Sequence, residues 1–213
     1  MNNRYFIYLA ATILLLTTVD NICYADENRK GFIFSAGLGG GYTSVSSTLL
    51  SNSGFSTFGL GLTAGLGYAP SNKSSLIFGF KSIIFIDEVA SVWQNWHDKM
   101  QGDDLGALGA KLISPFVYSL SPLFRSHSIF GIVEYTYFLN ETSPSFLFSG
   151  TVGGGFLYDK IEAQTVAGLG LSAGAGYEFT GKVAIQCDLL YTSSPADKLQ
   201  SFSVLLTLKK YFY

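Results

Sequence analysis

Hydrophobic residues alternate with small or polar residues over long stretches of this chain. From residue 58 to residue 68 the even positions hold Phe, Leu, Leu, Ala, Leu and Tyr, whereas the odd positions hold glycine or threonine. The same period of two continues from 167 to 179, where alanine, leucine and aromatic residues alternate with glycine, serine and glutamate. Because successive side chains of a β-strand point to opposite faces, each stretch predicts a strand with one apolar face and one nearly bare face.

The glycine-rich face indicates how these strands pack. In a soluble β-sandwich the apolar face would pack on a second sheet, and the outer face would carry lysine, glutamate and threonine rather than glycine. A small barrel in lipid has the reverse arrangement, with apolar side chains toward the hydrocarbon and a crowded interior that favours small residues. We therefore expect the glycine-rich face to line the interior of a barrel.

The alternation predicts eight strands, three pairs of which are joined by short turns. Pro, Gly, Asn and Ser supply the turn residues, and aromatic residues beside each turn suit a membrane interface. An even number of strands places both chain ends on one side, as in single-chain bacterial barrels. We predict an all-β fold, an antiparallel up-and-down transmembrane β-barrel with strands at 31–46, 55–69, 74–86, 127–140, 145–157, 165–179, 182–192 and 201–213.

A long insertion, residues 87–126, separates the third and fourth strands. Its apolar residues recur at helical spacing, which predicts a short amphipathic helix with a contact face formed by Val89, Val92, Trp93, Trp96 and Met100. We expect the insertion to be extracellular because the three short turns would occupy the periplasmic side. A barrel of ten strands is the alternative, with 105–118 and a partner near 88–97 as two further crossings.

Composition narrows the class further. Hydrophobic residues make up 48% of the 213 residues and charged residues 13%, which is an apolar composition for a soluble domain. After the first 25 residues, no apolar run reaches the roughly 18 residues that a membrane helix needs, so a helical membrane protein is excluded. The net charge of −2 provides no broad attraction for nucleic acid, which we do not expect as a partner.

The first 25 residues have the pattern of a secretory signal peptide. Arg4 precedes an apolar run from 5 to 19, and residues 23–25 form a small-x-small cleavage site before Asp26. We therefore expect residues 1–25 to be removed and residues 26–213 to form a single barrel domain. Cys187 is then the one cysteine left, so no intrachain disulfide can form.

The C-terminal segment carries the most specific motif. From 204 to 213 it reads Val-Leu-Leu-Thr-Leu-Lys-Lys-Tyr-Phe-Tyr, with an aromatic end and alternating apolar positions before it. Together with 167–192, this segment resembles the last strands of small eight-stranded outer-membrane barrels of the porin family or OmpA-like type. Lys210 departs from the family pattern, which usually has an apolar residue there. The resemblance implies a C-terminal assembly signal formed by Leu206, Leu208, Phe212 and Tyr213.

The same resemblance implies a location and a set of partners. It implies an integral membrane protein of the bacterial (Gram-negative) cell outer membrane that contacts outer-membrane lipids, is inserted by the barrel assembly machinery through its C-terminal strand, and needs no cofactor. This architecture hosts many roles, so it implies no particular ligand. We expect a non-enzymatic surface protein with a structural or binding role through its extracellular loops and a possible extracellular ligand. The alternatives are a narrow channel for small or hydrophobic solutes and a lipid A-modifying enzyme.

Several ionisable residues fall on the glycine-rich, inward face. We predict an interior polar network that comprises Lys81, Glu134, Glu178, Gln186 and Asp188, with Thr136 beside it. Buried charges are costly unless they are paired, and one lysine cannot pair with three carboxylates. Lys209 or water must therefore contribute. A packed ionic core that closes the lumen is the favoured interpretation, and a gated narrow conduit is the alternative.

Other candidate chemistry has simpler explanations. Two histidines, His97 and His127, are too few for a multi-histidine metal site. His127 lies between two serines, which suggests a hydrolase, but neighbours in a strand point to opposite faces and Glu134 has the opposite parity from His127. We therefore interpret His127 as a polar residue at the outer end of a strand. The G-x-G-x-x-A segments at 59–64 and 168–173 lie within uninterrupted strand patterns, so they predict barrel lumen rather than a dinucleotide site.

Overall fold

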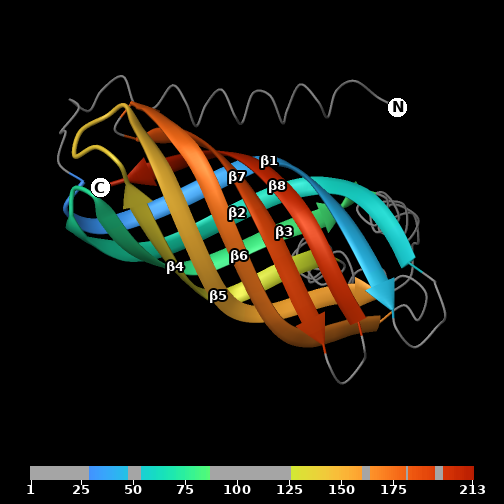
Figure 1. Cartoon of the computed structure of the whole chain (residues 1–213). Helices are drawn as coiled ribbons and strands as arrows, with labels where there is room; N and C mark the ends of the chain where they lie inside the picture. The colour runs from blue at the N-terminus through green and yellow to red at the C-terminus, as the bar shows by residue number, and fades with distance from the viewer. Residues whose placement is uncertain (1–28, 48–53, 87–125, 160–163, 181, 195–198) are drawn as a thin grey trace, which may run out of the picture.

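The chain forms a closed antiparallel barrel. The computed structural model describes residues 29–47, 54–86, 126–159, 164–180, 182–194 and 199–213. Each strand pairs with the next one along the chain, and the last strand pairs with the first to complete the ring (Figure 1). The strands are β1 (Gly31–Ser47), β2 (Gly54–Ser71), β3 (Ser74–Phe85), β4 (Ser126–Phe138), β5 (Ser145–Asp159), β6 (Gln164–Thr180), β7 (Val183–Ser194) and β8 (Leu199–Phe212).

The eight-stranded prediction is confirmed. The ten-stranded alternative is wrong because β3 pairs directly with β4 from Ser74 to Ile84, which leaves no place for further strands between them. The predicted signal peptide, 1–25, and the predicted helix of the insertion, with its contact face, lie outside the described residues. Within the described ranges, no helix is long and apolar enough to cross a membrane.

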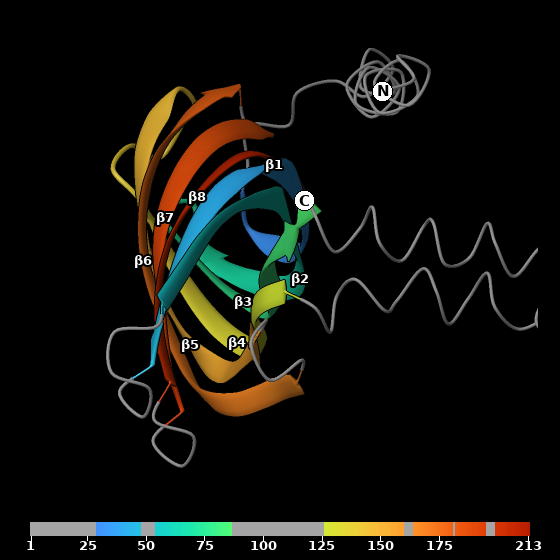
Figure 2. The ribbon, with the colours of Figure 1, turned by 90° about the vertical axis from the view of Figure 1, so that its right-hand side faces the viewer.

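The two ends of the barrel differ in their connections. Short turns join β2 to β3, β4 to β5 and β6 to β7 at one end, where the C-terminus also lies, and we call this the turn end (Figure 1). Arg29 contacts two of these turns. The other four connections leave from the opposite end, which we call the loop end. Figure 2 shows the strands curving around one common interior. Both ends of the described chain therefore lie on one side, as an even number of strands predicts.

Apolar side chains cover the outside of the barrel. Phe58, Leu66 and Leu169 are 68%, 65% and 69% exposed, and the glycines that alternate with them face inward. A Cβ added to Gly170 would lie 2.7 Å from the side chain of Ile129, so the interior has no room for one. The prediction that the apolar face points outward and the glycine-rich face points inward is thus confirmed. This surface is the arrangement of a membrane-spanning barrel, because lipid solvates apolar side chains and water does not.

A β-bulge interrupts β4 at Gly131, whose φ is +59°. Phe80 pairs with Phe130 and Gly79 with Ile132, so Gly131 has no partner on β3. Gly131 suits this position because glycine adopts positive φ without a steric penalty. The extra residue changes which positions face inward, because Ile129 and Ile132 belong to the same interior cluster. His127 and Glu134 therefore face the same lumen, and the prediction that they have opposite orientations is wrong.

Candidate functional site in the barrel interior

The interior consists of apolar and polar layers stacked along the barrel axis. The inward residues of β8 give the order, since they alternate between apolar clusters and polar groups from the turn end to the loop end: Tyr211, Lys209, Thr207, Leu205, Ser203, Ser201 and Leu199. Tyr211, Leu205 and Leu199 belong to three separate apolar clusters. The lumen along the described strands is thus filled by side chains and is crossed by three apolar layers.

The central polar layer is a network of ion pairs. The Lys81 Nζ lies 2.8 Å from Glu134 Oε2 and 2.8 Å from Asp188 Oδ1, and it donates a third hydrogen bond to Ser172. The Lys209 Nζ lies 2.5 Å from Glu134 Oε1. The side-chain amide of Gln186 donates to Asp188 at 2.9 Å. All of these side chains are buried, so each charge depends on its partners rather than on water.

Glu178 lies apart from this network. The structure brings four of the five predicted network residues together, but Glu178 sits at the turn end, where it forms an ion pair with Arg29. Alternation along a strand fixes which face a residue occupies, whereas its height along the axis depends on the stagger between strands. The prediction therefore placed Glu178 on the correct face but in the wrong layer.

The buried charges balance among the described residues. Arg29, Lys81 and Lys209 supply three positive charges, and Glu134, Glu178 and Asp188 supply three negative charges. Lys209 contributes as expected, whereas Arg29 was missed by the sequence reasoning. The sequence does indicate an inward position for Arg29, because it precedes the inward residue Ile33 by four positions and so has the same parity along β1. The complete pairing indicates a structural role for the ionic core.

His127 lies in a second polar layer nearer the loop end. It lies at the loop-end start of β4, as its interpretation as a polar residue at the outer end of a strand expects, and its side chain is fully buried in the lumen. Its Nε2 lies 2.6 Å from Thr192 Oγ1 and 3.1 Å from Ser201 Oγ, and its Nδ1 contacts Ser203. Both ring nitrogens are therefore occupied by hydroxyl groups, which leaves neither for a metal ion.

Ser201 and Ser203 contact the His127 ring, but no carboxylate among the described residues orients that ring as a hydrolase triad requires. Ser82 and Ser128 hydrogen-bond to each other at 2.6 Å, on the opposite side of the sheet from His127. The predicted separation of His127 from its neighbouring serine thus holds. Glu134 shares the lumen with His127, but Lys81 and Lys209 bind its carboxylate. An apolar layer also lies between the two polar layers and consists of Ile83, Ile129, Ile132, Leu190 and Leu205.

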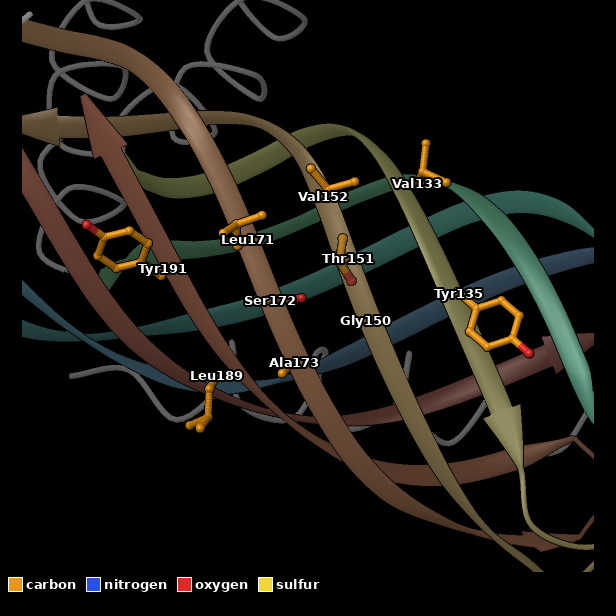
Figure 3. A pocket seen from close by; sticks show the side chains of 10 residues that line it. All are labelled: Val133, Tyr135, Gly150, Thr151, Val152, Leu171, Ser172, Ala173, Leu189 and Tyr191. Atoms are coloured by element: carbon orange, nitrogen blue, oxygen red, sulfur yellow. The ribbon is translucent and has the colours of Figure 1, made fainter. Parts of the chain in front are cut away.

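An open groove lies on the outer surface of the described strands. It has a volume of about 640 Å³ and spans β4 to β7 (Figure 3). Gly150 pairs with Ala173 at its floor, and both residues are small. The lining contains no charged side chain.

The predicted C-terminal assembly signal lies at the turn end and along the outside of β8. Leu206 and Leu208 are exposed on the outer surface, and the ring of Phe212 lies 5.4 Å from that of Phe34 on β1. Tyr213 instead packs against the apolar cluster at the turn end. Its burial there raises the pKa of its hydroxyl group. The role of this segment in assembly stays a prediction.

The fold and the filled interior define a class, a small closed barrel with an apolar outer surface. No protein-family model and no curated protein matches the chain. Among solved structures, Neisserial surface protein A matches with a TM-score of 0.44 and 13% identity, over 85% of this chain and 97% of that chain. The N-terminal β-barrel domain of Pseudomonas aeruginosa OprF matches with a TM-score of 0.43 and 9% identity, over 86% and 98%.

A third similar structure is the outer membrane protein OprG from Pseudomonas aeruginosa. Its TM-score is 0.39 and its identity is 12%, over 88% of this chain and 99% of that chain. These neighbours are eight-stranded outer-membrane barrels, which is the resemblance that the C-terminal motif implies. At such identities and TM-scores, the likeness carries no argument about what this chain does.

Proposed function

We propose that this protein is an integral outer-membrane surface protein with a non-enzymatic structural or binding role, exerted through the connections at its loop end. The observation that carries this proposal is the filled lumen. Three apolar clusters and a balanced ionic layer occupy the interior along the described strands. A rigid barrel with a filled interior has its outer surface and its loops available for interaction, and loops on a rigid scaffold commonly carry binding residues.

The outer surface and the predicted signal peptide support the proposed location. Exposed apolar side chains on every strand require lipid, and a secretory signal peptide would deliver the chain beyond the inner membrane. We infer that outer-membrane lipids contact this surface and that the barrel assembly machinery recognises the C-terminal strand. The short turns would then face the periplasm, and the insertion 87–126 would face the cell exterior.

A conductance measurement tests the proposal against its main alternative, a narrow channel. The purified protein, inserted into planar lipid bilayers in molar KCl, is expected to give no defined single-channel steps, because charged and apolar layers both cross the lumen. A porin measured in the same bilayers serves as the positive control. Reproducible steps of one size from the folded protein would contradict a filled lumen and would favour the channel.

A further inference from the structure

Arg29 enters the barrel at the turn end and is enclosed there. It is 2% exposed, although it is the first residue that the structure describes. Its Nη1 donates to the carbonyl oxygen of Asn72, in the turn between β2 and β3, at 2.9 Å. The same nitrogen donates to the carbonyl oxygens of Asn140 at 2.9 Å and Glu141 at 3.0 Å, in the turn between β4 and β5. One side chain thus connects two turns that are distant in sequence.

The other two nitrogens of the guanidinium group and its flat face also have partners. The Nη2 contacts the Glu178 carboxylate and donates to Ser143 Oγ at 3.2 Å, and the Nε lies 3.4 Å from Glu178 Oε1. The Phe138 ring covers the face of the group, with 4.4 Å between Cζ and the ring centroid. Both Glu178 and Phe138 are buried. Hydrogen-bond acceptors therefore surround the edge of the planar guanidinium group, and an aromatic ring packs against its face.

This geometry distinguishes a guanidinium from an ammonium group. A guanidinium presents five N–H donors in a fixed plane and stacks on aromatic rings, whereas an ammonium has three donors on one atom. The two Glu178 contacts require two neighbouring nitrogens, Nε and Nη2. The turn carbonyls require a third nitrogen, Nη1, whose N–H groups point away from Glu178. A lysine in this position could not reach all of these acceptors at once.

We propose that the turn end is a guanidinium-binding site formed by Asn72, Phe138, the 140–143 turn and Glu178, which Arg29 occupies as a ligand from the same chain. Every other member of the site belongs to a strand or a short turn of the barrel. Arg29 lies two residues before the start of β1, outside the strands and turns that form the rest of the site. The strands and turns of the barrel thus form the guanidinium-binding site. A free alkylguanidinium, or an arginine side chain from another chain, can occupy this site when Arg29 is removed.

Chemical rescue of Arg29→Ala tests the proposal. The full chain carrying this substitution, folded in lipid vesicles, should lose several degrees in its thermal unfolding midpoint, because Glu178 and the turn carbonyls lose their donors. Ethylguanidinium at millimolar concentration should restore part of the loss. Ethylammonium at the same concentration should not, and neither compound should shift the unmodified protein. Equal effects of the two compounds, or no effect of either, would overturn the proposal.

A second variant shows whether the rescue occurs at this site. In Arg29→Ala with Glu178→Gln the carboxylate is absent, so ethylguanidinium should have at most a small effect; an undiminished rescue would place its action elsewhere and would overturn the assignment. If Arg29→Ala does not fold unaided, refolding yield becomes the readout. The yield should then rise with ethylguanidinium and not with ethylammonium, and an unchanged yield with both would contradict the proposal.

Discussion

Replacing Lys81 by methionine is expected to destabilise the barrel by about 3–5 kcal/mol, the cost typical of removing one partner from a buried ion pair. Lys81 bonds both Glu134 and Asp188, each at 2.8 Å. Without it, Lys209 still pairs with Glu134, but Asp188 retains only the neutral amide of Gln186 and nearby hydroxyls. Urea titration of the folded protein in vesicles, followed by circular dichroism, measures the free energy of unfolding.

Two further variants separate the loss of charge pairing from a general effect of the substitution. Lys73→Met breaks the exposed pair with Glu141, whose nitrogen and oxygen are 3.8 Å apart, and should cost about 0–1 kcal/mol. Adding Asp188→Asn to Lys81→Met restores the charge balance and should recover much of the lost stability. If Lys81→Met costs no more than Lys73→Met, the ionic layer does not hold the interior together.

Gly39→Ala is expected to prevent folding or to cost more than the ~1–3 kcal/mol typical of overpacked sites. A Cβ at this position would lie 1.8 Å from the carbonyl oxygen of Leu206 and 2.8 Å from the Cα of Thr207. These are backbone atoms of β8, so the clash cannot be relieved by a side-chain rotation. It acts on the pairing of β1 with β8, which closes the barrel. The measurement is the fraction of protein that shows the heat-modifiable mobility of a folded barrel in a detergent gel.

Gly150→Ala is the matched control. Gly150 also lies in the middle of a strand, but it faces outward, and a Cβ there would meet nothing within 4 Å. Its stability should stay within ~0.5 kcal/mol of the unmodified protein. Similar folded fractions for Gly39→Ala and Gly150→Ala would contradict the inward crowding that the fold requires.

The strands could be predicted from the sequence because each one is long and its period is rarely broken. Strand β6 alternates between alanine or leucine and glycine over most of its length, and the structure keeps that alternation. The prediction fails where one residue shifts the period. The bulge at Gly131 reverses the parity of β4, and a single glycine within a strand pattern does not by itself specify a bulge.

The interior site was predicted only in part, for two physical reasons. Alternation gives the face of a residue and not its height along the axis, so Glu178 could not be separated from Lys81 and Asp188. Arg29 shares the inward parity of β1, but it lies two residues before the first strand, where the alternation of apolar and small residues has not yet begun. The partners of Arg29 are mostly backbone carbonyls, and their arrangement exists only after the turns have come together.

The central claim is that lipid surrounds the apolar face of this barrel and that side chains fill its interior. Nuclear Overhauser effects between lipid acyl-chain protons and leucine methyl groups test it most directly, because they report contacts shorter than about 5 Å in the unmodified protein. Adjacent residues provide matched pairs, since Leu189 and Leu206 are 46% and 54% exposed whereas Leu190 and Leu205 are both fully buried. The account predicts lipid contacts at Leu189 and Leu206 and none at Leu190 and Leu205. Lipid contacts at the second pair and not at the first would contradict it.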